Sequence, residues 1–108
     1  MAELTSAEGA DGEVTLARDE TGTLVITLSG EIDLSNVERF AGVMSEIAPG
    51  EEHLVFDLSD LVFLDSSGLA LVLAAAVRAR HTTLRDASPL IRRIVEATGL
   101  TEAVKLEP

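Results

Sequence analysis

Two apolar runs in the second half of the chain are joined by four small or polar residues, Asp65-Ser66-Ser67-Gly68. The run before them, Leu61–Leu64, is short and bulky, as is typical of the end of a strand. The run after them, Leu69–Val77, is rich in Leu and Ala and has no breaker, which predicts a helix. The chain therefore passes here from a strand, through a turn, into the N-terminus of a buried helix.

The four joining residues suit the start of a helix. The first backbone N–H groups of a helix have no partner within it, and the helix dipole favours negative charge there. Asp65, Ser66 and Ser67 can accept hydrogen bonds from those groups. The same position is suited to a phosphate, so a hydroxyl group stands where a phosphate would be tolerated.

The other patterns along the chain alternate between strand and helix. Period-two apolar runs indicate strands, and apolar residues three and four apart indicate helices. The expected elements are strands over 14–16, 24–28, 53–58 and 81–85, helices over 35–48, 67–80 and 88–98, and a last strand or turn over 101–106. This order predicts one α/β domain over residues 13–108, with a mixed sheet of four to five strands packed with three to four helices. Residues 1–12 are small and polar, and we expect a flexible tail.

Charge and composition limit the possible partners. Eight basic and nineteen acidic residues give 108 residues a formal net charge of −11, which repels nucleic acid backbones and anionic lipid. We therefore expect no direct nucleic acid or membrane partner. The chain has no Cys and begins without a recognisable signal peptide, and its longest apolar run is too short for a membrane span. These features predict a cytoplasmic protein.

Three kinds of chemistry are poorly supported by the sequence. A nucleophile elbow needs Gly at the position of Leu64, and neither His follows the serines near the end of the chain. A phosphoacceptor Asp of the receiver type needs an acidic pair after the first strand, and that pair is absent. Asp57, Asp60 and Asp65 are better interpreted as caps and turns. With two His and no Cys, no metal site is predicted.

The second helix is apolar on more than one side. A helical wheel assigns Leu69, Val72, Leu73, Ala76 and Val77 to the core face, and it places Leu71, Ala74, Ala75 and Arg78 on the opposite side. That outer stripe carries a single charge, where a solvated helix face normally carries several. Two interpretations remain open: a second packing contact within the domain, or a surface on which a partner docks.

Asp-Ser-Ser-Gly-Leu after an apolar strand, with Gly30-Glu31-Ile32-Asp33 about thirty residues earlier, resembles the STAS domain, and most of all its free-standing anti-sigma factor antagonists. The resemblance covers about 14–106. The strand around Thr82–Arg85 departs from it, because relatives have a more hydrophobic strand there. The resemblance implies the same α/β architecture. It also implies that Ser66 is the phosphoacceptor, with Asp65 as its acidic neighbour, Gly68 at the start of the helix and Asp33 on the surrounding surface. Combined with the outer stripe of the second helix, this gives the predicted partner-binding residues: Asp33, Asp65, Ser67, Gly68, Leu71, Ala74, Ala75 and Arg78.

The resemblance further implies a function without catalysis or cofactor. The unphosphorylated domain would bind an anti-sigma factor that is also a serine kinase, and thereby release the sigma factor. Phosphorylation of Ser66 would end that binding, and a serine phosphatase would restore it. The alternative is a STAS interaction module of a stress-signalling assembly or a lipid-transport complex. The sequence names neither the sigma factor, the kinase, the phosphatase nor the signal.

Overall fold

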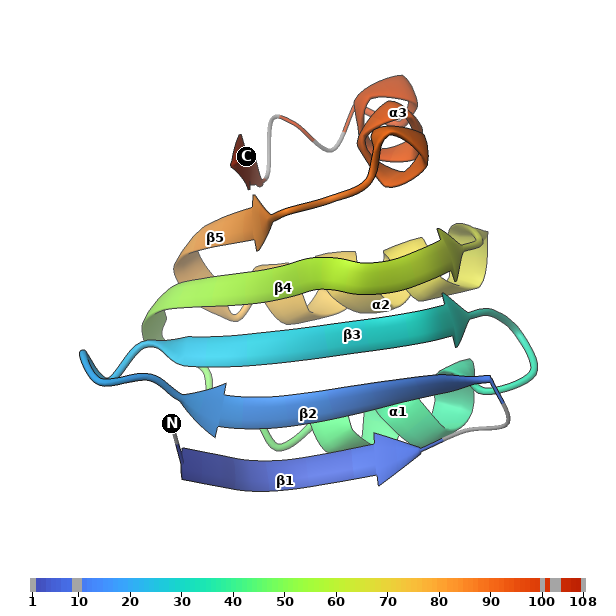
Figure 1. The fold of residues 1–108 in the computed structure, drawn as a ribbon. Coiled ribbons are helices and arrows are strands. Elements are labelled where there is room, and N and C mark those ends of the chain that lie inside the picture. The colour runs from blue at the N-terminus through green and yellow to red at the C-terminus, as the bar shows by residue number, and fades with distance from the viewer. Residues whose placement is uncertain (1, 9–10, 100, 102–103, 108) are drawn as a thin grey trace.

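A computed structural model describes residues 2–8, 11–99, 101 and 104–107. Its elements, shown in Figure 1, are β1 Ala2–Glu8, β2 Gly12–Arg18, β3 Leu24–Ile32, α1 Val37–Met44, β4 Glu51–Leu64, α2 Ser66–Ala76, β5 Ala79–Arg85, α3 Pro89–Ala97 and β6 Lys105–Glu107. None of the helices in these ranges has the length and apolar content needed to cross a bilayer.

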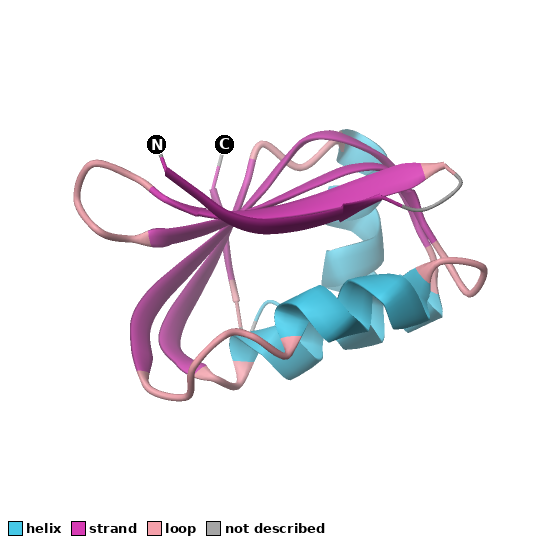
Figure 2. Cartoon of the chain, turned by 90° about the horizontal axis from the view of Figure 1, so that it is seen from below, coloured by secondary structure: helices cyan, strands magenta, loops and turns pink. Residues whose placement is uncertain are grey.

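The strands form one mixed sheet whose spatial order is the order of the chain, β1-β2-β3-β4-β5-β6. The pairs β1–β2 and β2–β3 are antiparallel, whereas β3–β4, β4–β5 and β5–β6 are parallel. Each pair of parallel neighbours is connected by a helix, and all these connections advance across the sheet in the same direction. Such crossovers are right-handed. The helices therefore lie on one side of the sheet, as the view in Figure 2 shows.

The core lies between that side of the sheet and the helices. Alternate residues of β3 and β4 point into it, and Phe40 of α1 and Ile91 of α3 are fully buried against them. Ile26 and Phe56 are paired neighbours at the centre of the sheet and are also fully buried. Only three residues of the chain are aromatic, so branched aliphatic side chains fill most of this volume.

The sequence prediction of one α/β domain with a mixed sheet and three helices is confirmed. The strand count is higher than the expected four to five, because Ala2–Glu8 pairs with β2 as β1, within the segment that we expected to be a flexible tail. Backbone hydrogen bonds along a free sheet edge do not require an apolar pattern in the added strand. The strand expected over 81–85, which is less hydrophobic than in relatives, is present as β5. It begins at Ala79, and its Thr82 and Thr83 are buried.

Candidate functional site

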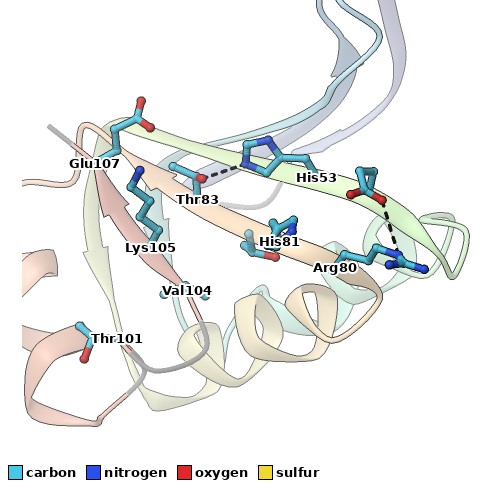
Figure 3. A pocket seen from close by; sticks show the side chains of 10 residues that line it. His53, Arg80, His81, Thr83, Thr101, Val104, Lys105 and Glu107 are labelled. Carbon is cyan, nitrogen blue, oxygen red and sulfur yellow. Dashed lines mark hydrogen bonds and ion pairs between the residues drawn. The ribbon is translucent and has the colours of Figure 1, made fainter.

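An open hollow of about 730 Å³ along β5 contains both histidines (Figure 3). His53 Nε2 lies 2.8 Å from Thr83 Oγ1, and Arg80 pairs with Glu52 at 3.5 Å. Among the described lining residues, the carboxylates of Glu52 and Glu107 are matched by Arg80 and Lys105, so these side chains give no charge of one sign. No serine lines this hollow, and no three acidic or histidine residues in the described ranges are grouped to hold a metal ion. None of the site residues predicted from the sequence is among the described residues that line this hollow.

The turn between β4 and α2 is built around the carboxylate of Asp65. Asp65 is the N-cap of α2, and its Oδ1 accepts hydrogen bonds from Ser67 N at 2.9 Å and Gly68 N at 3.0 Å. The Ser67 hydroxyl donates to the same oxygen at 2.6 Å. The other oxygen, Oδ2, accepts from Leu34 N in the loop between β3 and α1 at 3.2 Å. One carboxylate therefore holds both the start of α2 and the neighbouring loop.

The two serines of the turn have different environments. Ser67 is half-buried, and its hydroxyl is committed to Asp65. Ser66 is exposed as the first residue of α2, and its side chain makes no hydrogen bond to the part of the chain that the structure describes. It lines a shallow groove of about 250 Å³ with Leu69, Ala70, Leu73 and Thr98. Of the two hydroxyl groups, that of Ser66 is thus the one open to reaction.

Gly68 is buried where α2 comes close to the ends of β3 and β4. A β-carbon at this position would lie 2.5 Å from Leu64 Cδ1 and 2.9 Å from the backbone oxygen of Ile32. The second contact cannot be relieved by a side-chain rotation, because the atom belongs to the backbone of a central strand. Glycine therefore sets how closely the Ser66 turn packs on the sheet.

The direction in which α2 faces differs from the prediction. Leu71 and Ala75, expected on the outer stripe, are 8 % and 2 % exposed, because that side of the helix packs against α1. Val77, expected in the core, is 75 % exposed, and Leu73 is only half-buried. An almost wholly apolar helix offers no polar face from which its orientation could be predicted.

The exposed side of α2 is a continuous stripe that begins at the serine. Spacings of three and four residues place side chains on one helix face. We call the following set the α2 stripe: Ser66, Ala70, Leu73, Ala74 and Val77. Of the four predicted outer residues, only Ala74 belongs to it.

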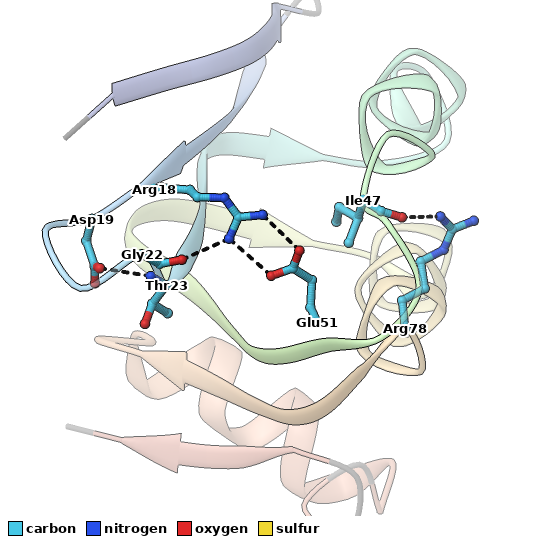
Figure 4. A network of polar contacts seen from close by, with 7 residues as sticks. All are labelled: Arg18, Asp19, Gly22, Thr23, Ile47, Glu51 and Arg78. Carbon is cyan, nitrogen blue, oxygen red and sulfur yellow. Dashed lines mark hydrogen bonds and ion pairs between the residues drawn. The ribbon is translucent and has the colours of Figure 1, made fainter.

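Arg78 and Asp33, two further predicted partner-binding residues, have contacts within the domain. The Arg78 guanidinium donates to the carbonyl oxygen of Ile47 at 2.6 Å and so binds the segment that follows α1 (Figure 4). In the same view, Arg18 and Glu51 join the ends of β2 and β4 through N–O distances of 2.8 and 3.1 Å. Asp33 Oδ1 accepts from Ser35 N at 2.9 Å, a local turn contact that leaves Asp33 half-exposed.

Sequence reasoning missed the residues that shape the loop between β3 and α1. Asn36 is buried, accepts from Asp33 N at 3.0 Å and donates to the Glu31 carbonyl oxygen at 2.8 Å. Leu34 lies in the same loop, and its backbone N–H donates to Asp65. The residue is nevertheless 77 % exposed. The signal available in the sequence was an Asn directly before a helix, a residue type that bonds to nearby backbone.

Hydrogen bonds from Ser67, and then from the Gly68 amide, lower the pKa of the Asp65 carboxyl. A carboxyl whose pKa is lower in the folded state adds stability above its unfolded pKa, about 3.9 for Asp, and loses it as pH falls through the folded value. We expect Asp65→Asn to reduce the fall in Tm between about pH 5 and pH 2. Thermal melts across that range check this, with Asp60→Asn as the matched control. Identical pH profiles for Asp65→Asn and the natural sequence would contradict it.

The chain is similar in sequence to known proteins. The family model described as "Mlab, STAS domain" matches residues 15–107. An anti-sigma F factor antagonist from Paenibacillus polymyxa is 31 % identical over 85 residues, which are 73 % of this chain and 73 % of that protein.

Two solved structures have a similar fold. An anti-sigma factor antagonist from Mycobacterium paratuberculosis superimposes with a TM-score of 0.76 at 27 % identity, over 90 % of this chain and 86 % of its own. The Bacillus cell fate determinant SpoIIAA in its phosphorylated form gives a TM-score of 0.60 at 26 % identity, over 86 % of this chain and 89 % of its own. The fold thus resembles that of a protein named as an anti-sigma factor antagonist.

Proposed function

The chain belongs to the STAS domain family and is an anti-sigma factor antagonist, and on this basis we propose that Ser66 is the switch that controls its binding. In this proposal the unphosphorylated protein binds, in the cytoplasm, an anti-sigma factor that is also a serine kinase, and the sigma factor is released. The kinase transfers phosphate to Ser66, the complex separates, and a serine phosphatase restores the binding form. The chain is then a substrate of these enzymes and has no catalytic role of its own.

One observation carries the choice of residue. Ser66 presents an exposed hydroxyl with no hydrogen-bond partner in the described chain, whereas the Ser67 hydroxyl is held 2.6 Å from Asp65 Oδ1. A kinase must bring the acceptor oxygen to ATP, and Ser67 would first have to give up a charge-assisted hydrogen bond, which is worth about 1.5–3 kcal/mol. Ser66 has no such cost.

Phosphate on Ser66 should spare the fold and prevent binding. It adds about −1.5 to −2 charge at the N-terminus of α2, where the helix dipole stabilises it by about 0.3–1 kcal/mol. The same charge stands next to Asp65 at the head of the α2 stripe. Burying it under a partner without a new cation costs several kcal/mol, while a hundredfold loss of affinity requires only about 2.7 kcal/mol.

The α2 stripe supplies the apolar part of the proposed contact surface. Below Ser66 it presents only small or aliphatic side chains, with no charge, over three turns of helix. A surface of this kind gains from burial at about 25 cal/mol per Å² of apolar area. Leu71 and Ala75 then act indirectly, because their packing on α1 sets the angle at which α2 presents the stripe.

Ala74→Glu tests the stripe. The site is exposed, so we expect a change in stability within about 0.5 kcal/mol. We expect affinity for the anti-sigma factor to fall tenfold or more, about 1.4 kcal/mol, because a carboxylate would be buried at the contact. Calorimetric titration measures this. Ala48→Glu makes the same charge change at an exposed site near the start of β4 and should bind normally. Equal affinities for the two variants would exclude the stripe from the interface.

A further inference from the structure

Leu34 is held in an exposed position. It is 77 % exposed, and single exposed Leu side chains are ordinary on protein surfaces. Its backbone is not free, however, since Leu34 N donates to Asp65 Oδ2 at 3.2 Å across 31 residues of sequence. On either side the loop is bound by Asn36 and by the Asp33–Ser35 contact. The loop is therefore fixed with a large apolar side chain directed away from the domain.

The two oxygens of Asp65 are held unequally. Within the described residues, Oδ1 accepts three hydrogen bonds, from Ser67 N, Ser67 Oγ and Gly68 N, while Oδ2 accepts a single one, from Leu34 N. A phosphate on Ser66 would repel this carboxylate and compete for the N–H groups at the start of α2. The contact with the fewest supporting bonds, Oδ2 to Leu34, should be lost first.

We infer that Asp65 couples the phosphorylation state of Ser66 to the loop between β3 and α1, and that Leu34 is an apolar contact for the anti-sigma factor. The inference rests on the proposed function. The partner would cover the α2 stripe and Leu34 together, since Asp65 joins the two segments. Phosphorylation would then weaken binding twice, by placing charge at the head of the stripe and by releasing Leu34 from the position in which it is presented.

The coupling can be tested without any partner. Asp65→Asn keeps an oxygen that can cap α2, because Asn and Asp are equally good N-caps, but its amide nitrogen cannot accept from Leu34 N. We expect amide hydrogen exchange at Leu34 to become about tenfold faster, with Gly68 unchanged. Protein carrying phosphoserine at position 66, incorporated during translation, should show the same acceleration at Leu34. Gly68 serves as the reference amide only in Asp65→Asn, because the phosphate competes for its N–H group. Ser67→Ala removes a contact of Oδ1 only, and Leu34 should exchange as in the natural sequence.

The contact is tested by binding. We expect Leu34→Ala to lower affinity for the purified anti-sigma factor tenfold or more, and Leu90→Ala to leave it unchanged. Leu90 is the matched control, because it is 48 % exposed at the start of α3, whereas Thr98 near Ser66 follows the end of that helix. Unchanged exchange at Leu34 in both Asp65→Asn and the phosphoserine protein, or normal binding by Leu34→Ala, would overturn the inference. If neither the natural sequence nor any variant bound the anti-sigma factor, the proposed function would be refuted. Amide exchange at Leu34 would still decide whether Asp65 couples Ser66 to the loop between β3 and α1.

Discussion

Ser66→Asp is expected to fold like the natural sequence and to bind the anti-sigma factor about a hundredfold more weakly. An acidic residue in the first turn of a helix is favourable, so the melting temperature should not fall. The new carboxylate would nevertheless have to be desolvated beside Asp65 when a partner covers the α2 stripe, and such a charge costs several kcal/mol. A hundredfold change corresponds to about 2.7 kcal/mol and is easily resolved by calorimetric titration.

Two further variants separate charge from side-chain loss at this site. Ser66→Ala should bind the anti-sigma factor with normal affinity and take up no phosphate, because only the hydroxyl has been removed. Ser67→Ala should still be phosphorylated, although the loss of its charge-assisted bond to Asp65 lowers stability by about 1.5–3 kcal/mol. Full binding by Ser66→Asp would show that charge at this position is not what ends the complex.

Gly68→Ala should be strongly destabilising for so small a change. The added β-carbon would meet the Ile32 backbone oxygen at 2.9 Å, so α2 or β3 must move. Overpacking of this kind costs about 1–3 kcal/mol, and each kcal/mol lowers Tm by about 4–8 °C in a domain of this size. Thermal and denaturant unfolding measure the effect. The displaced start of α2 should also weaken binding to the anti-sigma factor.

Gly42→Ala is the matched control, because Gly42 lies exposed in α1 and a β-carbon added there would have no neighbouring atom within 4 Å. The same substitution should there raise stability by about 0.5–1 kcal/mol, since Ala restricts the unfolded chain and favours helix. The two variants should therefore differ in sign. A Gly68→Ala protein as stable as the natural sequence would mean that the close packing of α2 on β3 is not required.

Local sequence signals predicted most of the fold and the centre of the site. The turn 65–68 could be placed because a strand-like run, cap residues and a helix-like run occur in sequence, and Asp65 is indeed the N-cap of α2. The mixed sheet followed from a hairpin pattern and two helical crossovers. Each of these rests on residues close to one another in the chain, where propensity and capping act.

The errors concern contacts between distant segments. Whether Leu71 or Val77 is buried depends on where α1 lies, and α2 is apolar on every side, so its own sequence could not decide. The bond between Asp65 and Leu34 joins residues 31 apart and leaves no periodic trace. β1 pairs through backbone groups, which any sequence possesses. The helical wheel placed Arg78 on the outer face, whereas in the structure its guanidinium donates to the Ile47 carbonyl oxygen.

The most direct test of the Ser66 switch is to incubate the protein with ATP and its anti-sigma factor, locate the phosphate by mass spectrometry and measure the affinity of the phosphorylated form. We expect one phosphate, on Ser66, and an affinity at least a hundredfold below that of the unphosphorylated protein. Phosphate on Ser67 or on any other residue, or a complex that persists after Ser66 is fully phosphorylated, would contradict the proposed switch.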